Sequence, residues 1–341
     1  MLLITVQKYT QFHIFYHFFP LFDKPLFVLC NSTRYDIHRR SKPASSRTLP
    51  LPGLKTAPRK IALVTGATDG IGLETALRLA LMGYAVWCSG RSQEKAAQAA
   101  RQIRAACGHP EVYGLHADHA SMQELERLVQ DVQQNVTHLD VLIHNAGAVF
   151  PHFQTNTEGI EMTFAVNHLA PFYLSARLLP LLEAAPAARM VVVSSGSHWP
   201  ARICPESFTA PVRYNLLKAY GQSKLANLLF TFALAEKLKK RGSPVTVNAL
   251  CPGRIRTRIG NKNQPWYLSM GWSLLTRLSG GSVEKGARTP VWLATAAALE
   301  GVSGKYFKNE RVAASSPRSL HPESGAALWA SSESFTNLKF L

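Results

Sequence analysis

Cysteine is scarce in this sequence, with five residues among 341. No CxxC pair and no His/Cys spacing typical of zinc ligands occurs, so neither a disulfide framework nor a metal site is predicted. Cys88 and Cys251 fall in short apolar runs that we expect to be strands, where cysteine commonly serves as a small buried apolar side chain. Reactive thiols are therefore not expected at these two positions.

Acidic residues are also scarce, because 21 Asp and Glu stand against 38 Lys and Arg, a formal net charge of +17. Part of this excess lies at the N-terminus, where residues 1–60 contain ten Lys/Arg and two Asp. The sequence has no RNA-recognition aromatic motif, no zinc-finger spacing and no long basic helix. We therefore interpret the charge partly as a basic arm and predict no nucleic-acid partner.

A long uninterrupted apolar run is missing as well. Residues 1–30 are rich in Phe, Leu and Ile, but Lys8, Asp23 and Lys24 interrupt them, so no stretch of about 20 apolar residues suits a membrane span. Residues 31–58 are basic and rich in Ser and Pro, which is typical of a linker. Residues 1–58 have three interpretations: a weak membrane or targeting segment, a disordered arm, or an artefact of the assigned start site. We favour the last two. The compartment stays open between the cytoplasm and a membrane surface facing it.

From Lys60 onward, short apolar runs alternate with helical patterns. This alternation predicts an α/β fold, a doubly wound parallel sheet of Rossmann type in a single domain. The domain is expected over 59–310, between an N-terminal extension at 1–58 and a C-terminal tail at 311–341. Strands are predicted at 61–64, 85–89, 112–116, 139–143, 190–193, 245–250 and 304–307, and helices at 93–107, from a capping box at 121–124, and at 159–182 and 283–298.

A glycine-rich segment follows the first predicted strand and opens a helical pattern. Glycine allows close approach of the backbone to a phosphate, and a helix N-terminus offers backbone N–H groups to a pyrophosphate. The segment therefore predicts a dinucleotide site, with cofactor-binding residues Gly66, Thr68, Asp69, Gly70, Ile71 and Gly72.

Tyr220 and Lys224 lie four residues apart on one predicted helix, so both side chains project from the same face. A phenol with an ordinary pKa of about 10 is a poor base at neutral pH. We expect the nearby ammonium of Lys224 to lower the pKa of Tyr220 by favouring the phenolate. The pairing predicts Tyr220 as a general acid/base that exchanges a proton with an alcohol or carbonyl.

These motifs together resemble the signature of the short-chain dehydrogenases/reductases over about residues 59–310. The matching segments, in the order the family uses, are Gly66-x-x-x-Gly70-x-Gly72, Asn145-Ala146-Gly147, Tyr220-x-x-x-Lys224 and Pro252-Gly253. Residues 164–169, 193–198 and 223–227 look most like the retinol dehydrogenase and WW-domain oxidoreductase branch. The resemblance implies an oxidoreductase that acts on a CH–OH group with a nicotinamide cofactor.

The resemblance also implies a catalytic set of four residues. Ser195 would donate a hydrogen bond to the substrate oxygen, with Ser194 as the alternative, and Tyr220 would transfer the proton. Lys224 would additionally hold the nicotinamide ribose. Asn167, on its own helix, would order a water chain toward Lys224.

The remaining cofactor contacts also follow from the resemblance. Asp118 would hold the adenine amine, although it could cap the next helix as well, and Asn145 could equally bridge neighbouring strands. The chain departs from the family at Cys251, where many members have histidine, and at Ala170-Pro171 in place of Gly-His, which leaves fine substrate preference open. The implied contacts are Asp118, Asn145, Ala146, Gly147, Pro252, Gly253 and Thr257, besides Tyr220 and Lys224.

The end of the second predicted strand bears on cofactor choice. An acidic residue there would pair with the ribose hydroxyls of NAD, whereas a basic one would pair with the extra phosphate of NADP. No Asp or Glu occurs between Tyr84 and Gln93, and Arg91 occupies the position. NADP(H) is therefore favoured over NAD(H), with a solvated surface arginine as the alternative interpretation of Arg91.

The connection 254–282 is strongly apolar, and His198 and Trp199 are also expected to line the substrate pocket. Such a connection suits a hydrophobic alcohol or contact with a membrane surface, while a packed helix or a homodimer face is the alternative. We predict an NADP(H)-dependent oxidoreductase that interconverts a lipophilic alcohol and its aldehyde or ketone, of retinoid, steroid or polyprenoid type. The alternative is a catalytically quiet NADP-binding scaffold or sensor. The apolar residues are Trp266, Tyr267, Leu268, Met270, Trp272, Leu274 and Leu275.

Overall fold

The computed structural model describes residues 59–341 apart from 109–110, 211–212, 254 and 256–280. The described residues belong to one compact unit. The N-terminal arm, Thr257 and the apolar connection with Trp266 and Trp272 lie outside the described residues, so the expectations for them stay predictions.

The described residues form an eight-stranded sheet in the order β3-β2-β1-β4-β5-β6-β7-β8. Strands β1 to β7 run parallel, and β8 pairs antiparallel with β7. The order runs outward in both directions from β1 and β4, which confirms the predicted doubly wound, Rossmann-type sheet. The strands are β1 (Ile61–Val64), β2 (Ala85–Gly90), β3 (Val112–His116), β4 (Val141–His144), β5 (Arg189–Val193), β6 (Thr246–Cys251), β7 (Tyr306–Lys308) and β8 (Arg311–Val312).

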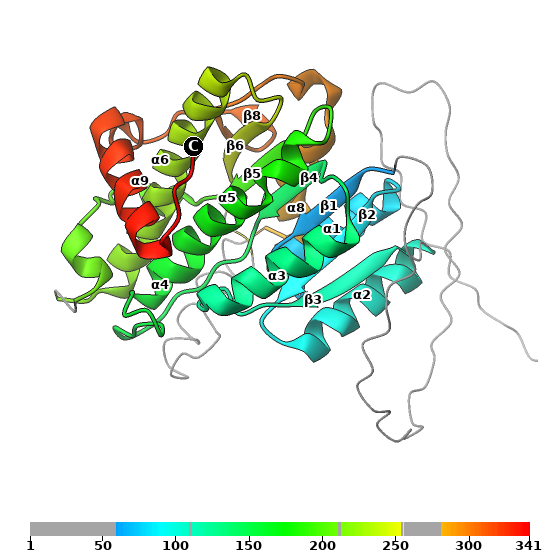
Figure 1. Cartoon of the computed structure of the whole chain (residues 1–341), viewed down its shortest axis with the longest axis horizontal. Helices are drawn as coiled ribbons and strands as arrows, with labels where there is room; N and C mark the ends of the chain where they lie inside the picture. Colours follow the sequence, from blue (N-terminus) through cyan, green and yellow to red (C-terminus); the bar gives the residue numbers. More distant parts are fainter. Residues whose placement is uncertain (1–58, 109–110, 211–212, 254, 256–280) are drawn as a thin grey trace, which may run out of the picture. The chain divides into compact units, whose positions relative to one another are not determined.

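Helices cover both faces of the sheet, with α3 and α5 in front of the strands and α8 behind them in Figure 1. The central strands serve both layers because successive side chains point to opposite faces. In β1, Leu63 joins the apolar cluster of one layer, and Ala62 and Val64 join that of the other. The layer of Leu63 comprises α3 (Met122–Asn135), α5 (Ala170–Glu183) and α6 (Leu216–Arg241), and the opposite layer comprises α1 (Gly70–Leu81), α2 (Gln93–Cys107) and α8 (Val283–Thr295).

Side-chain caps fix where several helices begin. At the capping box before α3, the Ser121 hydroxyl accepts from the Glu124 backbone N–H at 3.3 Å, and the Glu124 carboxylate accepts from the Asp118 N–H at 2.6 Å. Helix α6 begins at an Asn215 cap and ends at Gly242, whose φ of 69° is left-handed. These caps hold the residues of the candidate site on helices of defined length.

The helix predicted over 159–182 is divided in the structure. It begins at α4 (Met162–Phe164), because the Glu161 carboxylate caps the N–H groups of Thr163 and Phe164 at 2.8 Å each. A π-helical turn, η1 (Ala165–Leu169), follows and leads into α5. Asn167 lies in this turn, and such turns occur frequently at functional sites.

Residues 311–341, expected as a tail, pack against the domain. After β8, a short 3-10 helix η6 (Pro317–Leu320) leads into α9 (Pro322–Thr336), which lies beside α6 (Figure 1). Trp329 of α9 is 6% exposed, and its ring lies 5.1 Å from those of Phe172 and Phe340. The apolar core therefore includes residues beyond position 310.

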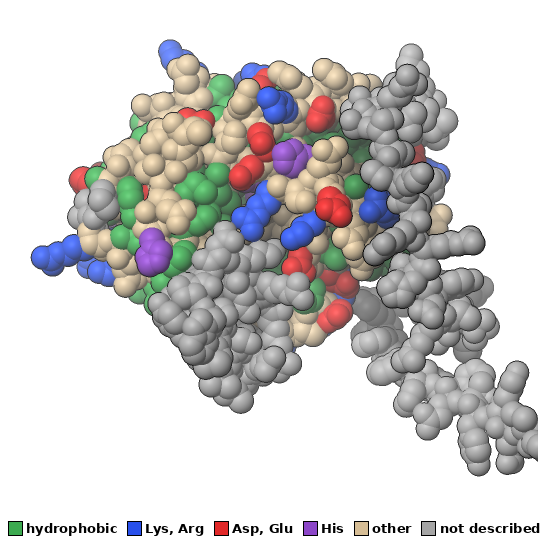
Figure 2. Space-filling view, turned by 90° about the horizontal axis from the view of Figure 1, so that it is seen from below, with side chains coloured by type: hydrophobic (Ala, Val, Ile, Leu, Met, Phe, Trp, Pro, Cys, Tyr) green, Lys and Arg blue, Asp and Glu red, His purple; other side chains and the backbone are tan. Residues whose placement is uncertain are grey.

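On the face seen in Figure 2, Lys and Arg side chains lie among Asp and Glu side chains. Ion pairs such as Arg177 with Glu126, 2.8 Å apart, join opposite charges on the described surface. No helix in the described part of the chain is long and apolar enough to cross a membrane.

Candidate active site

The glycine turn lies at the switch point of the sheet, between the carboxyl ends of β1 and β4. Gly66 and Gly70 have left-handed φ values of 64° and 57°. A Cβ on Gly66 would lie 2.8 Å from the Cα of Ala146, and one on Gly72 would lie 2.4 Å from the Gly66 carbonyl oxygen. Glycine is thus required both by backbone conformation and by the close approach of the turn to the loop after β4.

This turn fits a dinucleotide pyrophosphate. Residues 68–71 are half-exposed, and α1 begins at Gly70, so its first backbone N–H groups have no partner within the helix. Asp69 caps the Gly70 N–H at 2.8 Å. A ligand phosphate at this accessible helix N-terminus would meet both N–H donors and the favourable end of the helix dipole.

Arg91 follows β2 directly beside the turn. A Cβ on Gly90 would lie 2.4 Å from Thr68, so the end of β2 packs closely on the glycine turn. The Arg91 side chain belongs to an exposed residue. Its position is compatible with the predicted contact to a phosphate on the adenosine ribose.

Asn145 and Asp118 make structural hydrogen bonds. The Asn145 side-chain amide donates to the carbonyl oxygens of Thr65 and Gly66 at 2.9 and 3.2 Å, which bridges β1 and β4. The Asp118 carboxylate accepts from the Ala120 N–H at 3.0 Å in the turn before α3. Asn145 thus has the strand-bridging role that was its alternative to ligand contact, whereas Asp118 does not cap α3, whose N-cap is Ser121. Both residues remain partly exposed.

Asn167 joins the loop after β4 to α6. Its carbonyl oxygen accepts from the Ala148 N–H at 2.7 Å, and its amide donates to the Ala148 carbonyl and the Ser223 hydroxyl, both at 3.0 Å. The residue is fully buried. Ser223 was not predicted as a site residue from the sequence. Its position three residues after Tyr220 places the two side chains on the same face of the helix, which could have indicated it. The Asn167 side chain therefore positions α6 relative to β4.

The two serines at the end of β5 have different partners. The Ser194 hydroxyl donates to the Lys224 carbonyl oxygen at 2.8 Å, so it fastens β5 to α6. The Ser195 hydroxyl instead accepts from the Ser197 N–H at 3.2 Å and donates to the Ser197 hydroxyl at 3.3 Å, and it lies close enough to Tyr220 to lower the pKa of that phenol. This arrangement suits Ser195 as the serine that reaches a substrate oxygen together with Tyr220.

Lys224 is 2% exposed, and its ammonium donates to the Val193 carbonyl oxygen at 3.0 Å. It lies 5.7 Å from the centroid of the Tyr220 ring. Burial lowers the pKa of Lys224 from 10.5 to about 8. The ammonium therefore remains largely protonated at neutral pH, although removing it from water is costly.

The expected lowering of the Tyr220 pKa is wrong. Burial raises the pKa of Tyr220 to about 12, and the hydrogen bond from Ser195 only partly opposes this rise. Desolvation of the phenolate dominates because the Lys224 ammonium bonds the Val193 backbone, not the phenol oxygen. Tyr220 is thus a phenol, not a phenolate, at neutral pH.

His198 was expected to line the substrate pocket, but the structure buries it. Its ring is fully buried, whereas Trp199 is 48% exposed. Cys251 is buried at the end of β6, and Pro252 and Gly253 follow it at the same edge of the sheet as the glycine turn. Thr257 lies outside the described residues.

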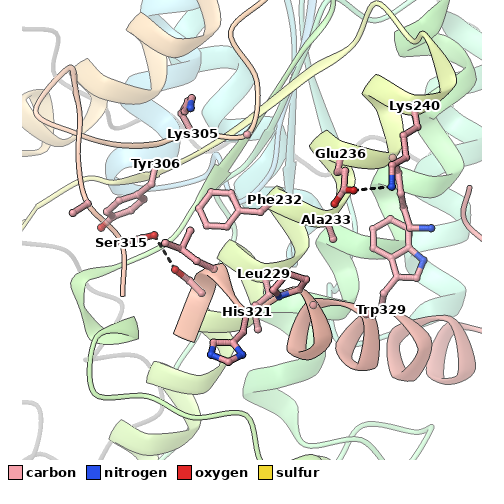
Figure 3. Close-up of a pocket in the computed structure, with 18 of the residues that line it drawn as sticks. Leu229, Phe232, Ala233, Glu236, Lys240, Lys305, Tyr306, Ser315, His321 and Trp329 are labelled. Atoms are coloured by element: carbon pink, nitrogen blue, oxygen red, sulfur yellow. Dashed lines mark hydrogen bonds and ion pairs between the residues drawn. The ribbon is translucent and has the colours of Figure 1, made fainter. Parts of the chain in front are cut away.

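A cavity of about 800 Å³ lies away from this chemistry, between α6, α9 and the strands β7 and β8 (Figure 3). Phe232, Tyr306 and Trp329 contribute to its wall, and none of the four predicted catalytic residues does. The described part of the chain contains no cluster of three or more His, Cys, Asp or Glu side chains that could hold a metal ion. The candidate site is therefore defined by the hydrogen-bonded groups at the sheet edge.

The fold and the site together define an α/β oxidoreductase that uses a nicotinamide dinucleotide. The short chain dehydrogenase family profile matches residues 60–268. The chain belongs to this family.

Relatives and solved structures agree with this assignment. Human retinol dehydrogenase 13 is 37% identical over 293 residues, which cover 84% of this chain and 88% of the relative. Human polyprenol dehydrogenase is 34% identical over 285 residues, 82% of this chain and 86% of the relative. The crystal structure of an uncharacterized protein from Mycobacterium paratuberculosis has a TM-score of 0.67 at 30% identity, covering 85% of this chain and 97% of that one. Pseudomonas aeruginosa RhlG, in an NADP active-site complex, has a TM-score of 0.56 at 27% identity, covering 73% and 93%.

Proposed function

We propose that this protein is an NADP(H)-dependent oxidoreductase that interconverts a lipophilic alcohol and its aldehyde or ketone, of retinoid, steroid or polyprenoid type. The proposal rests on the convergence of Ser195, Tyr220 and Lys224 at the sheet edge that also carries the glycine turn. The names of retinol dehydrogenase 13 and polyprenol dehydrogenase support the lipophilic substrate class.

Tyr220 is the proposed proton donor and acceptor. Because burial keeps its phenol protonated at neutral pH, its hydroxyl can give its proton to a carbonyl oxygen as that carbonyl is reduced. Ser195 donates a second hydrogen bond to the same oxygen and orients it. The buried ammonium of Lys224 then stabilises the phenolate that remains, which suits alcohol oxidation in the reverse direction.

The glycine turn and Arg91 would hold the cofactor. A bound nicotinamide cofactor would supply or accept the hydride. Arg91 supports NADP(H) because β2 is followed by this exposed cation and no carboxylate lies between Tyr84 and Gln93. Asn167 holds the loop after β4 to helix α6 through its bonds to Ala148 and Ser223. In this proposal, these bonds keep Tyr220 close to the cofactor that the glycine turn would bind.

The apolar residues of 266–275 support a hydrophobic entrance to this site or contact with a membrane surface. The alternative interpretation is that residues 266–275 form the contact face of a homodimer.

A turnover screen tests the proposal. Purified full-length protein is incubated with NADPH and a panel of retinoid, steroid and polyprenoid carbonyls, and NADPH oxidation is followed by absorbance. We expect turnover of at least one lipophilic member, and Tyr220→Phe should abolish it while leaving the Kd for NADPH unchanged, because only the hydroxyl is lost. Undiminished turnover by Tyr220→Phe would refute the role of Tyr220. Tight NADPH binding without turnover of any substrate would instead favour a scaffold or sensor.

A further inference from the structure

His198 connects Ser195 to the C-terminal segment. The residue lies three positions after Ser195 in the short helix η2 (Gly196–His198) and is fully buried. Its Nδ1 lies 2.6 Å from the backbone oxygen of Ser195. Its Nε2 lies 3.1 Å from the backbone nitrogen of Ser316, which is 118 residues further along the chain.

These two partners determine the protonation of the ring. The Ser195 oxygen can only accept, so Nδ1 must carry a proton, and the Ser316 N–H can only donate, so Nε2 must not. His198 is therefore neutral, with its single N–H on Nδ1. Burial lowers its pKa, which agrees with a neutral ring.

The segment on the far side of His198 is itself well ordered by hydrogen bonds. Ser316 is 1% exposed, and its carbonyl oxygen accepts from the Ser319 N–H at 2.9 Å and the Ser319 hydroxyl at 2.6 Å. The Ser319 hydroxyl also lies 2.8 Å from that of Ser315. Residues 315–320 thus form a fixed support for the imidazole.

Helix α6 supports the same loop from the opposite direction. A Cβ on Gly221 would lie 2.8 Å from the Ser197 carbonyl oxygen, so η2 rests directly on the helix position after Tyr220. The Tyr306 ring lies 5.3 Å from the His198 ring in an edge-on contact. The loop that begins at Ser195 is therefore held between α6 and the C-terminal segment.

We propose that His198 is a positioning residue, which transmits the fixed position of the 315–320 segment to Ser195 and so sets the distance between the hydroxyls of Ser195 and Tyr220. The inference rests on the proposed function, in which these two hydroxyls share the substrate oxygen. It adds the C-terminal segment to the structure on which catalysis depends. A small displacement of a substrate-binding group can lower a rate by about 100-fold.

Ser316→Pro tests this link by deleting a single N–H group. The φ of Ser316 is −62°, which a proline ring adopts, and its hydroxyl has no hydrogen-bond partner among the described residues. In the variant, the ring Cδ stands where the N–H met His198. Ser316→Ala is the matched control, because it removes the same hydroxyl and keeps the N–H.

We expect Ser316→Pro to lower kcat about 10- to 100-fold with the Kd for NADPH unchanged, and Ser316→Ala to match the unmodified protein in both. His198→Asn removes the same hydrogen bond by changing its acceptor. The asparagine amide can still donate to the Ser195 carbonyl oxygen, but it is too short to accept from the Ser316 N–H. The double variant should lose no more kcat than the single variants, since both break one connection.

Three results would overturn the proposal. They are an unchanged kcat in a folded Ser316→Pro, equal losses in Ser316→Pro and Ser316→Ala, and additive losses in the double variant. If Ser316→Pro does not fold, an unchanged kcat in His198→Asn overturns it alone. Failure of the proposed function is a separate result, because the unmodified protein would then turn over no carbonyl substrate.

Discussion

The buried cation at Lys224 should lower the stability of the protein. Burial lowers its pKa from 10.5 to about 8, which corresponds to about 3 kcal/mol in favour of unfolding when the group is charged. Lys224→Met removes the charge and keeps a side chain of similar length. The Val193 carbonyl then loses its bond from the ammonium and keeps the bond from the Asn227 side-chain amide at 3.4 Å, a loss of about 1 kcal/mol. We therefore expect the variant to be about 2 kcal/mol more stable than the unmodified protein at pH 7.

The pH dependence of this difference has a defined sign. Between pH 8 and 10.5, Lys224 is neutral in the folded protein but protonated in the unfolded chain, so the unfolded state binds more protons. The free energy of unfolding of the unmodified protein should therefore rise through this window by about 3 kcal/mol relative to Lys224→Met. Below pH 8 the full destabilisation is present. The raised pKa of Tyr220 acts in the opposite sense above pH 10, where the unfolded chain loses its phenol proton before the folded protein does.

Urea unfolding of both proteins, followed by tryptophan fluorescence from pH 7 to 10.5, measures this difference. The same variant should lose turnover, because the phenolate of Tyr220 loses its cationic neighbour. Parallel stability curves for the two proteins across the window would refute the reasoning, since they would show that Lys224 titrates alike in the folded and unfolded states.

Three further changes test other parts of the structure. Arg91→Asp should weaken NADPH relative to NADH by about 10- to 150-fold, from a charge contact of about 1.5–3 kcal/mol, and tighter NADH than NADPH binding by the unmodified protein in fluorescence titration would contradict the assignment. Trp329→Ala should cost about 3–5 kcal/mol in urea unfolding, because its ring is packed among three aromatic rings, and a loss below about 1 kcal/mol would show that α9 lies outside the cooperative core. Gly221→Ala should lower both the thermal midpoint and kcat, because its Cβ would meet the Ser197 carbonyl, and an unchanged kcat would show that η2 can move without consequence.

The sequence was sufficient for the order of strands and helices. Apolar runs of strand length and Ser or Asn caps depend on residues close together in the chain, so β1 to β6 and the start of α3 were located to within a few residues. The glycine turn was predictable for the same reason, since its conformation and the helix that follows are local. The spacing of Tyr220 and Lys224 on one helix was likewise local information.

Only the tertiary structure decided how these residues act on one another. The separate partners of Ser194 and Ser195 and the raised pKa of Tyr220 depend on which groups α6 buries against β5. The role of residues 311–341 depends on Trp329 packing on α5 and α6, and that of His198 on a bond to Ser316. The contacts of β5 with α6 join residues 30 positions apart, and those of Trp329 and Ser316 join segments more than a hundred positions apart. No local pattern encodes them, because burial and desolvation arise only when the sheet and its helical layers are assembled.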